Sequence, residues 1–179
     1  MQIYLSTLTE SDYEASLQTI VEAFQDVSES NHDEQELVKR IRSDANYNYE
    51  LEVVAKNDDG EVVGHILLSE IKIVSEQATY TALALAPLAV LKPYRNQGIG
   101  KALVQAGEER AATQDYDTII VLGDPGYYGR LGYEEAEQYG IYSPFELPSA
   151  YFMVKFIAED AQTAPRGKVV YSDAFNGSP

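Results

Sequence analysis

The chain has 179 residues, of which 29 are acidic and 13 basic, giving a formal net charge of −16. Such a charge repels nucleic acid and anionic membranes; it suits cationic ligands, solubility or adaptation to salt. Without cysteine the chain has no disulfide, no thiolate cluster and no acyl-cysteine intermediate, and its two histidines lie too far apart in sequence to indicate a metal site.

The length fits a single domain over residues 1–179, with a substantial core. No apolar run is long enough to span a bilayer, and the N-terminus lacks a basic region followed by an apolar stretch. We therefore expect a cytoplasmic protein, with no internal repeat and no linker long enough for a second domain.

Apolar periodicity and turn residues predict strands and helices in a mixed α/β order. A first helix is capped by Thr9 or Ser11 and ends at Phe24, and a second helix ends near Arg42. Asn57-Asp58-Asp59-Gly60 is a strong turn signal and predicts a β-hairpin. The expected strands are residues 3–5, 51–55, 61–71, 83–91, 118–122, 150–157 and 168–171.

The strand at residues 83–91 changes phase by one residue at Pro87. A slip of one residue predicts a β-bulge, where proline is tolerated, and proline also removes one N–H from the ladder. A neighbouring strand can then part from this one. Unpaired N–H and C=O groups would remain at Leu88, Ala89 and Val90, able to bind an extended, amide-bearing ligand as a false strand. The alternative is a kinked core strand without a ligand.

The turn that follows this strand contains Arg95, Asn96, Gln97, Gly98, Ile99 and Gly100 and leads into a helix. A helix start exposes unpaired N–H groups and the positive end of its dipole, and glycine lets a ligand approach the backbone. The turn therefore suits a phosphate or pyrophosphate, although glycine pairs also close ordinary loops. The residues expected to supply local positive charge are Lys92, Arg95, Lys101 and Arg130.

A tyrosine-rich segment follows the strand at residues 118–122. Asp124 before Pro125 indicates an N-cap with proline at the first helical position, and the short helix is expected to end at Gly132. Tyr127 and Tyr128 either pack, with their hydroxyls at the surface, or offer one hydroxyl as a proton donor to a leaving group.

Together these motifs resemble those of the GNAT superfamily of N-acetyltransferases, which use acetyl-coenzyme A. Residues 95–100 fit the family's Q/R-x-x-G-x-G/A pyrophosphate loop, and residues 88–90 fit the bulged fourth strand whose backbone pairs with pantetheine. Residues 127–133 are similar to the F-Y-x-x-x-G-F segment. Residues 63–67, 85–90 and 151–175 resemble a bacterial subgroup of predicted acetyltransferases. The resemblance covers essentially the whole chain and implies a mixed central sheet with bulged, splayed strands flanked by helices.

The resemblance implies direct transfer of an acetyl group from acetyl-CoA, the co-substrate, to a primary amine. Tyr128 would be the general acid that protonates the thiolate, and a backbone N–H of Leu88 or a neighbour would hold the oxyanion. The implied cofactor-binding residues are Leu88, Ala89, Val90, Arg95, Asn96, Gln97, Gly98, Ile99, Gly100, Lys101 and Ala102.

The general base stays open among Glu70, His65 and a water chain. His65 on a strand that is apolar on both faces is typical of a hydrogen-bonded core histidine, and Glu70 at a strand end is typical of a solvated carboxylate. Carboxylates and aromatic rings suit a cationic amine. Residues in segments that line the acceptor side of similar folds are Asp33, Glu34, Tyr47, Tyr49, Tyr142 and Phe145.

A catalytically silent acyl-CoA binder, with a role in sensing or assembly, is the second class of function. The tyrosine at position 128 favours the enzyme, because binding alone does not need its hydroxyl. The chain lacks both a Walker Lys-Ser/Thr pair and the three-glycine dinucleotide fingerprint. The expected partner is a small-molecule or peptide amine rather than nucleic acid or membrane, and the protein is expected to be a monomer or homodimer.

Overall fold

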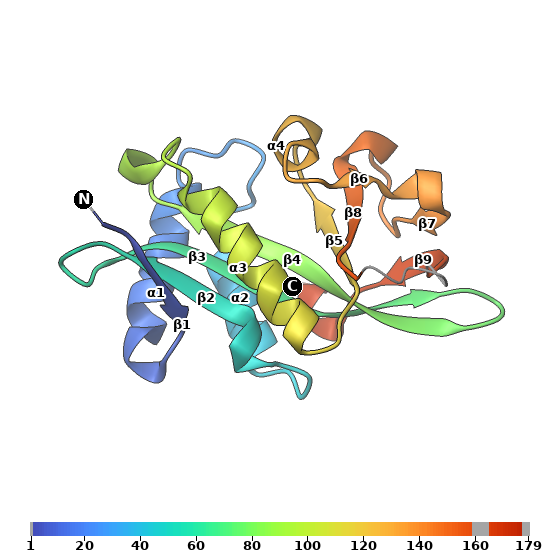
Figure 1. The fold of residues 1–179 in the computed structure, drawn as a ribbon, viewed down its shortest axis with the longest axis horizontal. Helices are drawn as coiled ribbons and strands as arrows, with labels where there is room; N and C mark the ends of the chain where they lie inside the picture. The colour runs from blue at the N-terminus through green and yellow to red at the C-terminus, as the bar shows by residue number, and fades with distance from the viewer. Residues whose placement is uncertain (1, 159–164, 177–179) are drawn as a thin grey trace. The chain divides into compact units, whose positions relative to one another are not determined.

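The computed structural model describes residues 2–158 and 165–176, which fall into two compact units. The first unit comprises residues 2–69 and 86–110, and the second comprises the described residues of 70–85 and 111–176. Strands β3 (Val62–Val74) and β4 (Thr79–Val90) each contribute to both units (Figure 1). Within the predicted tail at residues 151–175, residues 159–164 lie outside the described residues.

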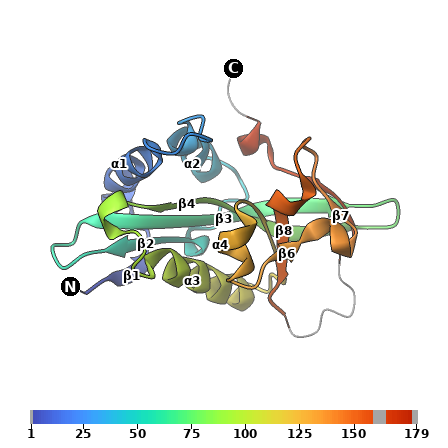
Figure 2. The same ribbon diagram turned by 90° about the horizontal axis from the view of Figure 1, so that it is seen from above.

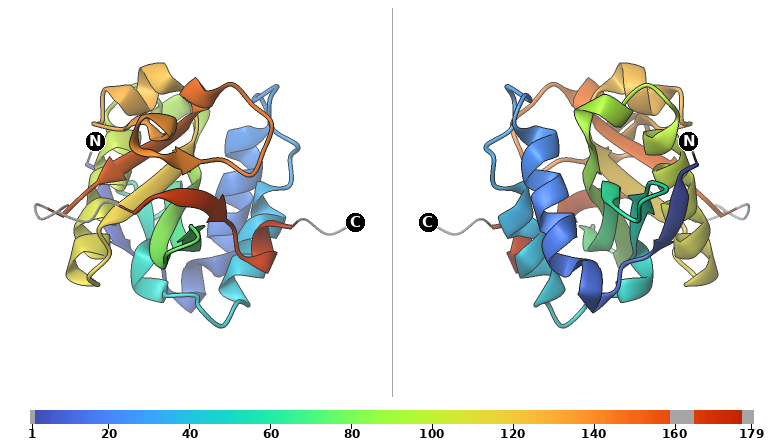
Figure 3. Two further views of the ribbon diagram at one scale, coloured as in Figure 1. Left: turned by 90° about the vertical axis from the view of Figure 1, so that its right-hand side faces the viewer. Right: turned by 90° about the vertical axis from the view of Figure 1, so that its left-hand side faces the viewer.

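The first unit has three layers. Its strands follow the order β1 (Tyr4–Thr7), β2 (Glu52–Lys56), β3 and β4. Helices α1 (Tyr13–Phe24) and α2 (Glu34–Arg42) lie side by side on one face of these strands, and α3 (Ile99–Thr113) covers the other face (Figures 2 and 3). Short 3₁₀ turns at Glu10–Asp12, Tyr49–Leu51 and Lys92–Tyr94 connect these elements.

Two glycines allow α3 to approach β3 closely. A Cβ atom on Gly64 would lie 3.0 Å from Leu103 Cδ1, and one on Gly107 would lie 3.2 Å from Leu68 Cδ1. Both distances are shorter than ordinary van der Waals contact, so a side chain at either position would push the helix and the strand apart. Leu103 is fully buried at this contact, as its helical spacing predicts.

A bulge in the β2–β3 hairpin decides which side chains share a face. Lys56 pairs with Val62, and the next pair skips one residue on β3. Because a slip of one residue turns every following side chain to the opposite face, the bulge places His65 opposite Val54. His65 therefore lies on the same face of the sheet as Glu52, toward the side that α1 and α2 cover.

The second unit contains both parallel and antiparallel strand pairs. Its strand order is β3, β4, β5 (Thr118–Leu122), β8 (Phe152–Phe156) and β6 (Glu134–Glu135), and β9 (Gly167–Val170) pairs with both β3 and β7 (Ile141–Tyr142). The β4–β5 and β7–β9 pairs are parallel, whereas β5–β8, β6–β8 and β3–β9 are antiparallel. Helix α4 (Pro125–Gly129) follows β5. Further 3₁₀ turns lie at Ala136–Tyr139, Ser149–Tyr151 and Asp173–Phe175.

The core of this unit consists of aliphatic and aromatic side chains from β3, β4, β5, β7, β8 and β9 and from the 3₁₀ turn after β6. Its buried members are Ile71, Ile73, Ala82, Ala84, Ile120, Ala136, Ile141, Phe152, Val154 and Val169. Five partly buried rings pack against them: Tyr80, Tyr139, Phe156, Tyr171 and Phe175. Across residues 2–158 and 165–176, no helix is both long and apolar enough to cross a bilayer.

The mixed sheet flanked by helices confirms the predicted fold class, and the hairpin turn at residues 57–60 and the strand at residues 118–122 are confirmed. Several boundaries were predicted wrongly; β4, for example, begins at Thr79 rather than at residue 83. Helix α1 begins only at Tyr13, because a 3₁₀ turn precedes it and Thr9 makes no side-chain cap. Strand β3 continues to Val74, so Glu70 lies inside a strand. Helix α4 ends at Gly129 rather than Gly132.

Candidate functional site

The predicted anion-binding turn lies in the first unit, between β4 and α3. Asn96 and Gly98 both have positive φ angles, 62° and 83°, and residues 96–98 are exposed. Backbone N–H groups in such a sequence of conformations can converge on an anion. The first N–H groups of α3 have no partner within the helix, and its dipole is positive at this end. The turn therefore offers a ligand its backbone and the start of a helix.

The side chains of this turn hold its backbone in place. Gln97 Nε2 donates a hydrogen bond to the Pro93 carbonyl at 3.1 Å. Arg95 Nε donates to the Val90 carbonyl at 2.9 Å. The prediction of an unpaired carbonyl at Val90 is thus wrong, because Arg95 donates a hydrogen bond to that carbonyl.

The C-terminal half of β4 lies in the same unit as the turn. The parallel register between β4 and β5 pairs residues up to Ala84, and β4 then continues to Val90. Pro87 and Ala89 are buried, whereas Leu88 is half-buried. The residues predicted to pair with an extended ligand therefore lie on β4 beyond its register with β5.

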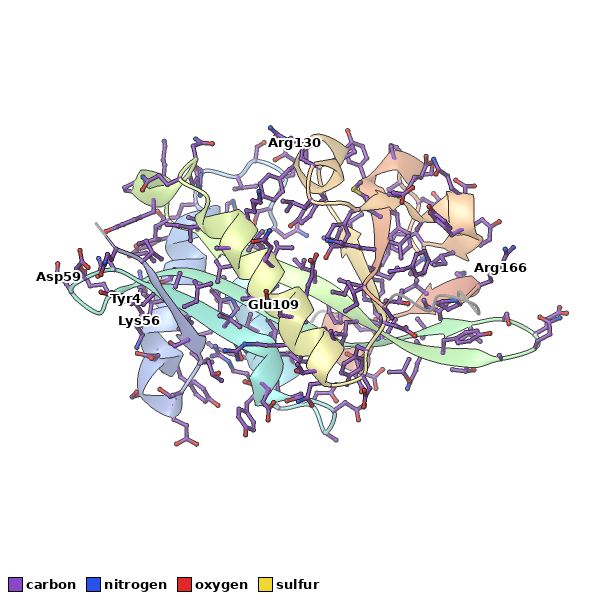
Figure 4. All side chains as sticks on the ribbon, viewed as in Figure 1. Tyr4, Lys56, Asp59, Glu109, Arg130 and Arg166 are labelled. Atoms are coloured by element: carbon purple, nitrogen blue, oxygen red, sulfur yellow. The ribbon has the colours of Figure 1, made fainter. Side chains whose placement is uncertain are left out.

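Only part of the predicted positive patch is exposed beside the turn. Lys92 and Lys101 are exposed, one in the 3₁₀ turn before it and the other in the first turn of α3. Arg95 is hydrogen-bonded within the protein. Arg130, labelled in Figure 4, belongs to the second unit, where its Nε donates to the Gly126 carbonyl at 2.9 Å.

Tyr128 lies on α4 in the second unit. The helix begins as predicted, since Asp124 Oδ1 accepts a hydrogen bond from the Gly126 N–H at 2.9 Å. The Tyr128 ring makes edge-to-face contacts with Tyr127 and Tyr133, with centroids 5.0 Å and 5.7 Å apart. Burial, and to a lesser degree Tyr127, raises the pKa of Tyr128 above its ordinary value. The hydroxyl therefore carries its proton at neutral pH.

Gly123, at the end of β5, makes room for the Tyr128 ring. A Cβ atom at this position would lie 2.4 Å from Tyr128 Cε2 and 2.8 Å from Cδ2. Real Cβ atoms do not approach so closely, so any side chain at position 123 would displace the ring. The glycine thus fixes where the tyrosine hydroxyl can lie.

The two candidate bases are both hydrogen-bonded to other side chains. His65 is fully buried, and its Nε2 lies 2.6 Å from Glu52 Oε2. This confirms the prediction of a hydrogen-bonded core histidine. Glu70, in the second unit, is half-buried and accepts a hydrogen bond from the Tyr116 hydroxyl.

Glu52 is the centre of a buried ionic cluster, hereafter the Glu52 cluster, which also contains Arg42, Tyr47 and His65. Arg42 Nη2 lies 2.7 Å from Glu52 Oε2, and the Tyr47 hydroxyl donates to Oε1 at 2.6 Å. Burial alone would raise the pKa of Glu52, but hydrogen bonds from His65 and Arg42 outweigh it and lower the pKa to about 2. Tyr47, predicted to face the acceptor, is used in this cluster instead.

The sequence interpretation missed Glu52 and Arg42. The available signal is that Glu52 directly precedes three apolar residues of β2, at positions 53–55. An isolated carboxylate in a buried strand needs a cationic partner. The bulge that brings His65 to the same face leaves no such signal in the sequence.

A cavity of about 170 Å³ lies in the second unit, and two of the predicted acceptor-side residues, Tyr142 and Phe145, line it. These two side chains are 50% and 51% exposed. The complete lining is Glu137, Ile141, Tyr142, Ser143, Phe145, Leu147, Ser149 and Phe152. The other predicted acceptor-side residues, Asp33, Glu34 and Tyr49, belong to the first unit.

Comparison with known proteins identifies the family to which the protein belongs. Residues 16–133 match the model of the acetyltransferase (GNAT) family. The chain is 32% identical over 143 residues to YhbS of Escherichia coli (strain K12), an uncharacterized N-acetyltransferase, and the match covers 80% of this chain and 83% of YhbS. It is also 33% identical over 116 residues to YjhQ, another uncharacterized N-acetyltransferase of that strain, covering 64% of each chain.

Two solved structures share the fold over nearly the full chain. The structure of YhbS from Escherichia coli in complex with CoA has a TM-score of 0.86 at 26% identity, covering 100% of this chain and 94% of that one. A GNAT family acetyltransferase from Brucella melitensis in complex with acetyl-CoA has a TM-score of 0.76 at 28% identity, covering 97% and 98%. The fold and the site motifs are those of an acyl-group transferase. The chain belongs to the GNAT family of N-acetyltransferases.

Proposed function

We propose that the protein transfers the acetyl group of acetyl-CoA directly to a primary amine, as one catalytic domain acting in the cytoplasm. The observation that carries the proposal is the exposed turn at residues 96–98, in which Asn96 and Gly98 have positive φ angles and which directly precedes α3. Two related structures contain CoA or acetyl-CoA. The residues proposed to form the cofactor site, either by contacting the ligand or by holding the turn that does, are Leu88, Ala89, Val90, Arg95, Asn96, Gln97, Gly98, Ile99, Gly100, Lys101 and Ala102.

In this proposal, the amine nitrogen attacks the thioester carbonyl and forms the new C–N bond. A backbone N–H of Leu88 or a neighbour stabilises the oxyanion that develops. The C–S bond then breaks, Tyr128 gives its proton to the departing sulfur, and the amine loses its own proton to solvent or a base. The raised pKa of Tyr128 supports this role, because the hydroxyl remains a proton donor throughout the neutral range.

The test is a thiol-release assay with acetyl-CoA and a library of amines. We expect coenzyme A release with at least one amine, and a fall in kcat of about 100-fold for Tyr128→Phe. Tyr127→Phe is the matched control, since it removes a neighbouring hydroxyl from the same helix, and should stay close to wild type. Acetyl-CoA binding without release from any amine would indicate the silent acyl-CoA binder. Full turnover by the Tyr128→Phe variant would exclude Tyr128 as the general acid.

We further propose a cationic small-molecule or peptide amine as the acceptor. The net charge of −16 attracts cations, and the cavity of the second unit combines Glu137 with the rings of Tyr142 and Phe145. In the same assay, Phe145→Ala should raise the KM for the amine and leave the KM for acetyl-CoA unchanged. An unchanged amine KM would remove this cavity from the acceptor site.

A further inference from the structure

The guanidinium of Arg95 is almost fully used by contacts within the first unit. Its Nη1 donates to Asp26 Oδ2 at 3.0 Å and its Nη2 to Oδ1 at 3.3 Å, which is a bidentate pair. Its Nη2 also donates to the Ala23 carbonyl, and its Nε donates to the Val90 carbonyl. These contacts employ four of the five N–H bonds of an arginine.

These contacts join α1, the connection that follows it, and β4 around the turn. Ala23 lies in the last turn of α1, where carbonyl groups lack helical partners and the dipole is negative. Asp26 follows that helix, and Val90 is the last residue of β4. Arg95 thus ties the end of α1 to the end of β4, immediately before the two residues with positive φ.

We propose that Arg95 is a positioning residue: Asp26 and the end of α1 hold its guanidinium, which fixes the backbone of residues 96–98 for the pyrophosphate of coenzyme A without contacting the phosphates. The inference rests on the proposed binding of acetyl-CoA at this turn. This proposal makes Asp26 part of the cofactor site, although its carboxylate is negatively charged, as the pyrophosphate is. The pair also lowers the pKa of Asp26, so the carboxylate stays charged at neutral pH.

The two possible roles of Arg95 predict opposite effects of removing Asp26. If the guanidinium binds phosphate directly, Asp26 competes for it, and Asp26→Ala would free a cation, delete a negative charge and tighten coenzyme A binding. If the guanidinium positions the turn through Asp26, the same substitution loosens the turn and weakens binding. The side chains of the pair are 31% and 39% exposed, so solvent screens the interaction and the effect is modest.

The experiment is calorimetric titration of the full-length protein with coenzyme A and acetyl-CoA, together with steady-state kinetics. For Asp26→Ala we expect a Kd about three- to fivefold higher, with kcat at saturation and the amine KM unchanged. Glu29→Gln is the matched control: it is exposed, lies in the same connection after α1 and removes the same charge. In an Arg95→Gln background, Asp26→Ala should have little further effect, because the pair acts as a unit.

The outcomes separate a failure of this inference from a failure of the proposed function. Tighter coenzyme A binding by Asp26→Ala overturns the positioning role and leaves the proposed function intact. Equal effects of Asp26→Ala and Glu29→Gln also overturn it, since they would reflect net charge alone. A wild-type protein that binds neither coenzyme A nor acetyl-CoA overturns the proposed function and this inference together.

Discussion

The two units of the molecule stabilise their buried polar groups in different ways. In the first unit, Glu52 is fully buried and held by the Arg42 guanidinium and the His65 ring, a cluster that joins α2, β2 and β3. In the second unit, Tyr128 and Tyr133 pack their rings edge to face, and burial raises the pKa of Tyr128, so its hydroxyl keeps its proton at neutral pH. A paired ion fixes geometry, whereas a protonated hydroxyl can donate its proton. In the proposed function, the first unit binds the ligand and the second supplies the proton.

The largest expected effect is the loss of the buried charge in the first unit. Glu52→Gln leaves Arg42 without its anion, and an unpaired buried charge costs about 3–5 kcal/mol of unfolding free energy. Urea unfolding measures this loss. The control is Glu36→Gln, whose partner Lys39 is 53% exposed; an exposed pair contributes under about 1 kcal/mol. Similar losses in both variants would contradict a special role for the Glu52 cluster.

The Glu52 cluster also makes the stability of the folded protein depend on pH. The pKa of Glu52 is about 2 in the folded protein and 4.5 when unperturbed, so its contribution is present above pH 4.5. Stability should fall as the pH drops from 4.5 toward 2, by at most about 3 kcal/mol from this group. Urea midpoints measured across this range for the wild type and Glu52→Gln provide the check. Parallel curves would show that Glu52 is not the group responsible.

In the second unit, Gly123→Ala should displace the Tyr128 ring, because the added Cβ would lie 2.4 Å from it. A shift of about 1 Å in a catalytic group lowers kcat by about 100-fold. We expect that loss without a change in the Kd for acetyl-CoA. Gly129→Ala is the control, since its Cβ would meet nothing within 4 Å. A Gly123→Ala enzyme with wild-type kcat would show that the ring position does not limit turnover.

A smaller effect is expected in the turn of the first unit. Gly98 has a φ of 83°, which costs other residues about 1–2 kcal/mol. Gly98→Ala meets no atom within 4 Å, so strain rather than a clash is the expected cause. We predict a Kd for acetyl-CoA raised about tenfold, measured by calorimetry. An unchanged Kd would show that the ligand does not need this conformation.

The sequence predicted what depends on neighbouring residues. The Asp124-Pro125 pair correctly predicted the start of α4, and residues 57–60 correctly predicted the hairpin turn. Contacts between distant residues left no local pattern: Arg95 meets Asp26 across 69 positions, and a one-residue bulge decides that His65 faces Glu52. The start of α1 was missed because residues 10–12 form a 3₁₀ turn whose composition also suits a helix start.

The central claim is that the first unit binds acetyl-CoA and the second performs the proton transfer. Its most direct test is to measure, for Gly98→Ala and Tyr128→Phe, both the Kd for acetyl-CoA and kcat at saturating substrates. We predict that Gly98→Ala raises the Kd and keeps kcat, and that Tyr128→Phe keeps the Kd and lowers kcat by about 100-fold. Wild-type kcat in Tyr128→Phe, or a change in both parameters for both variants, would contradict this division.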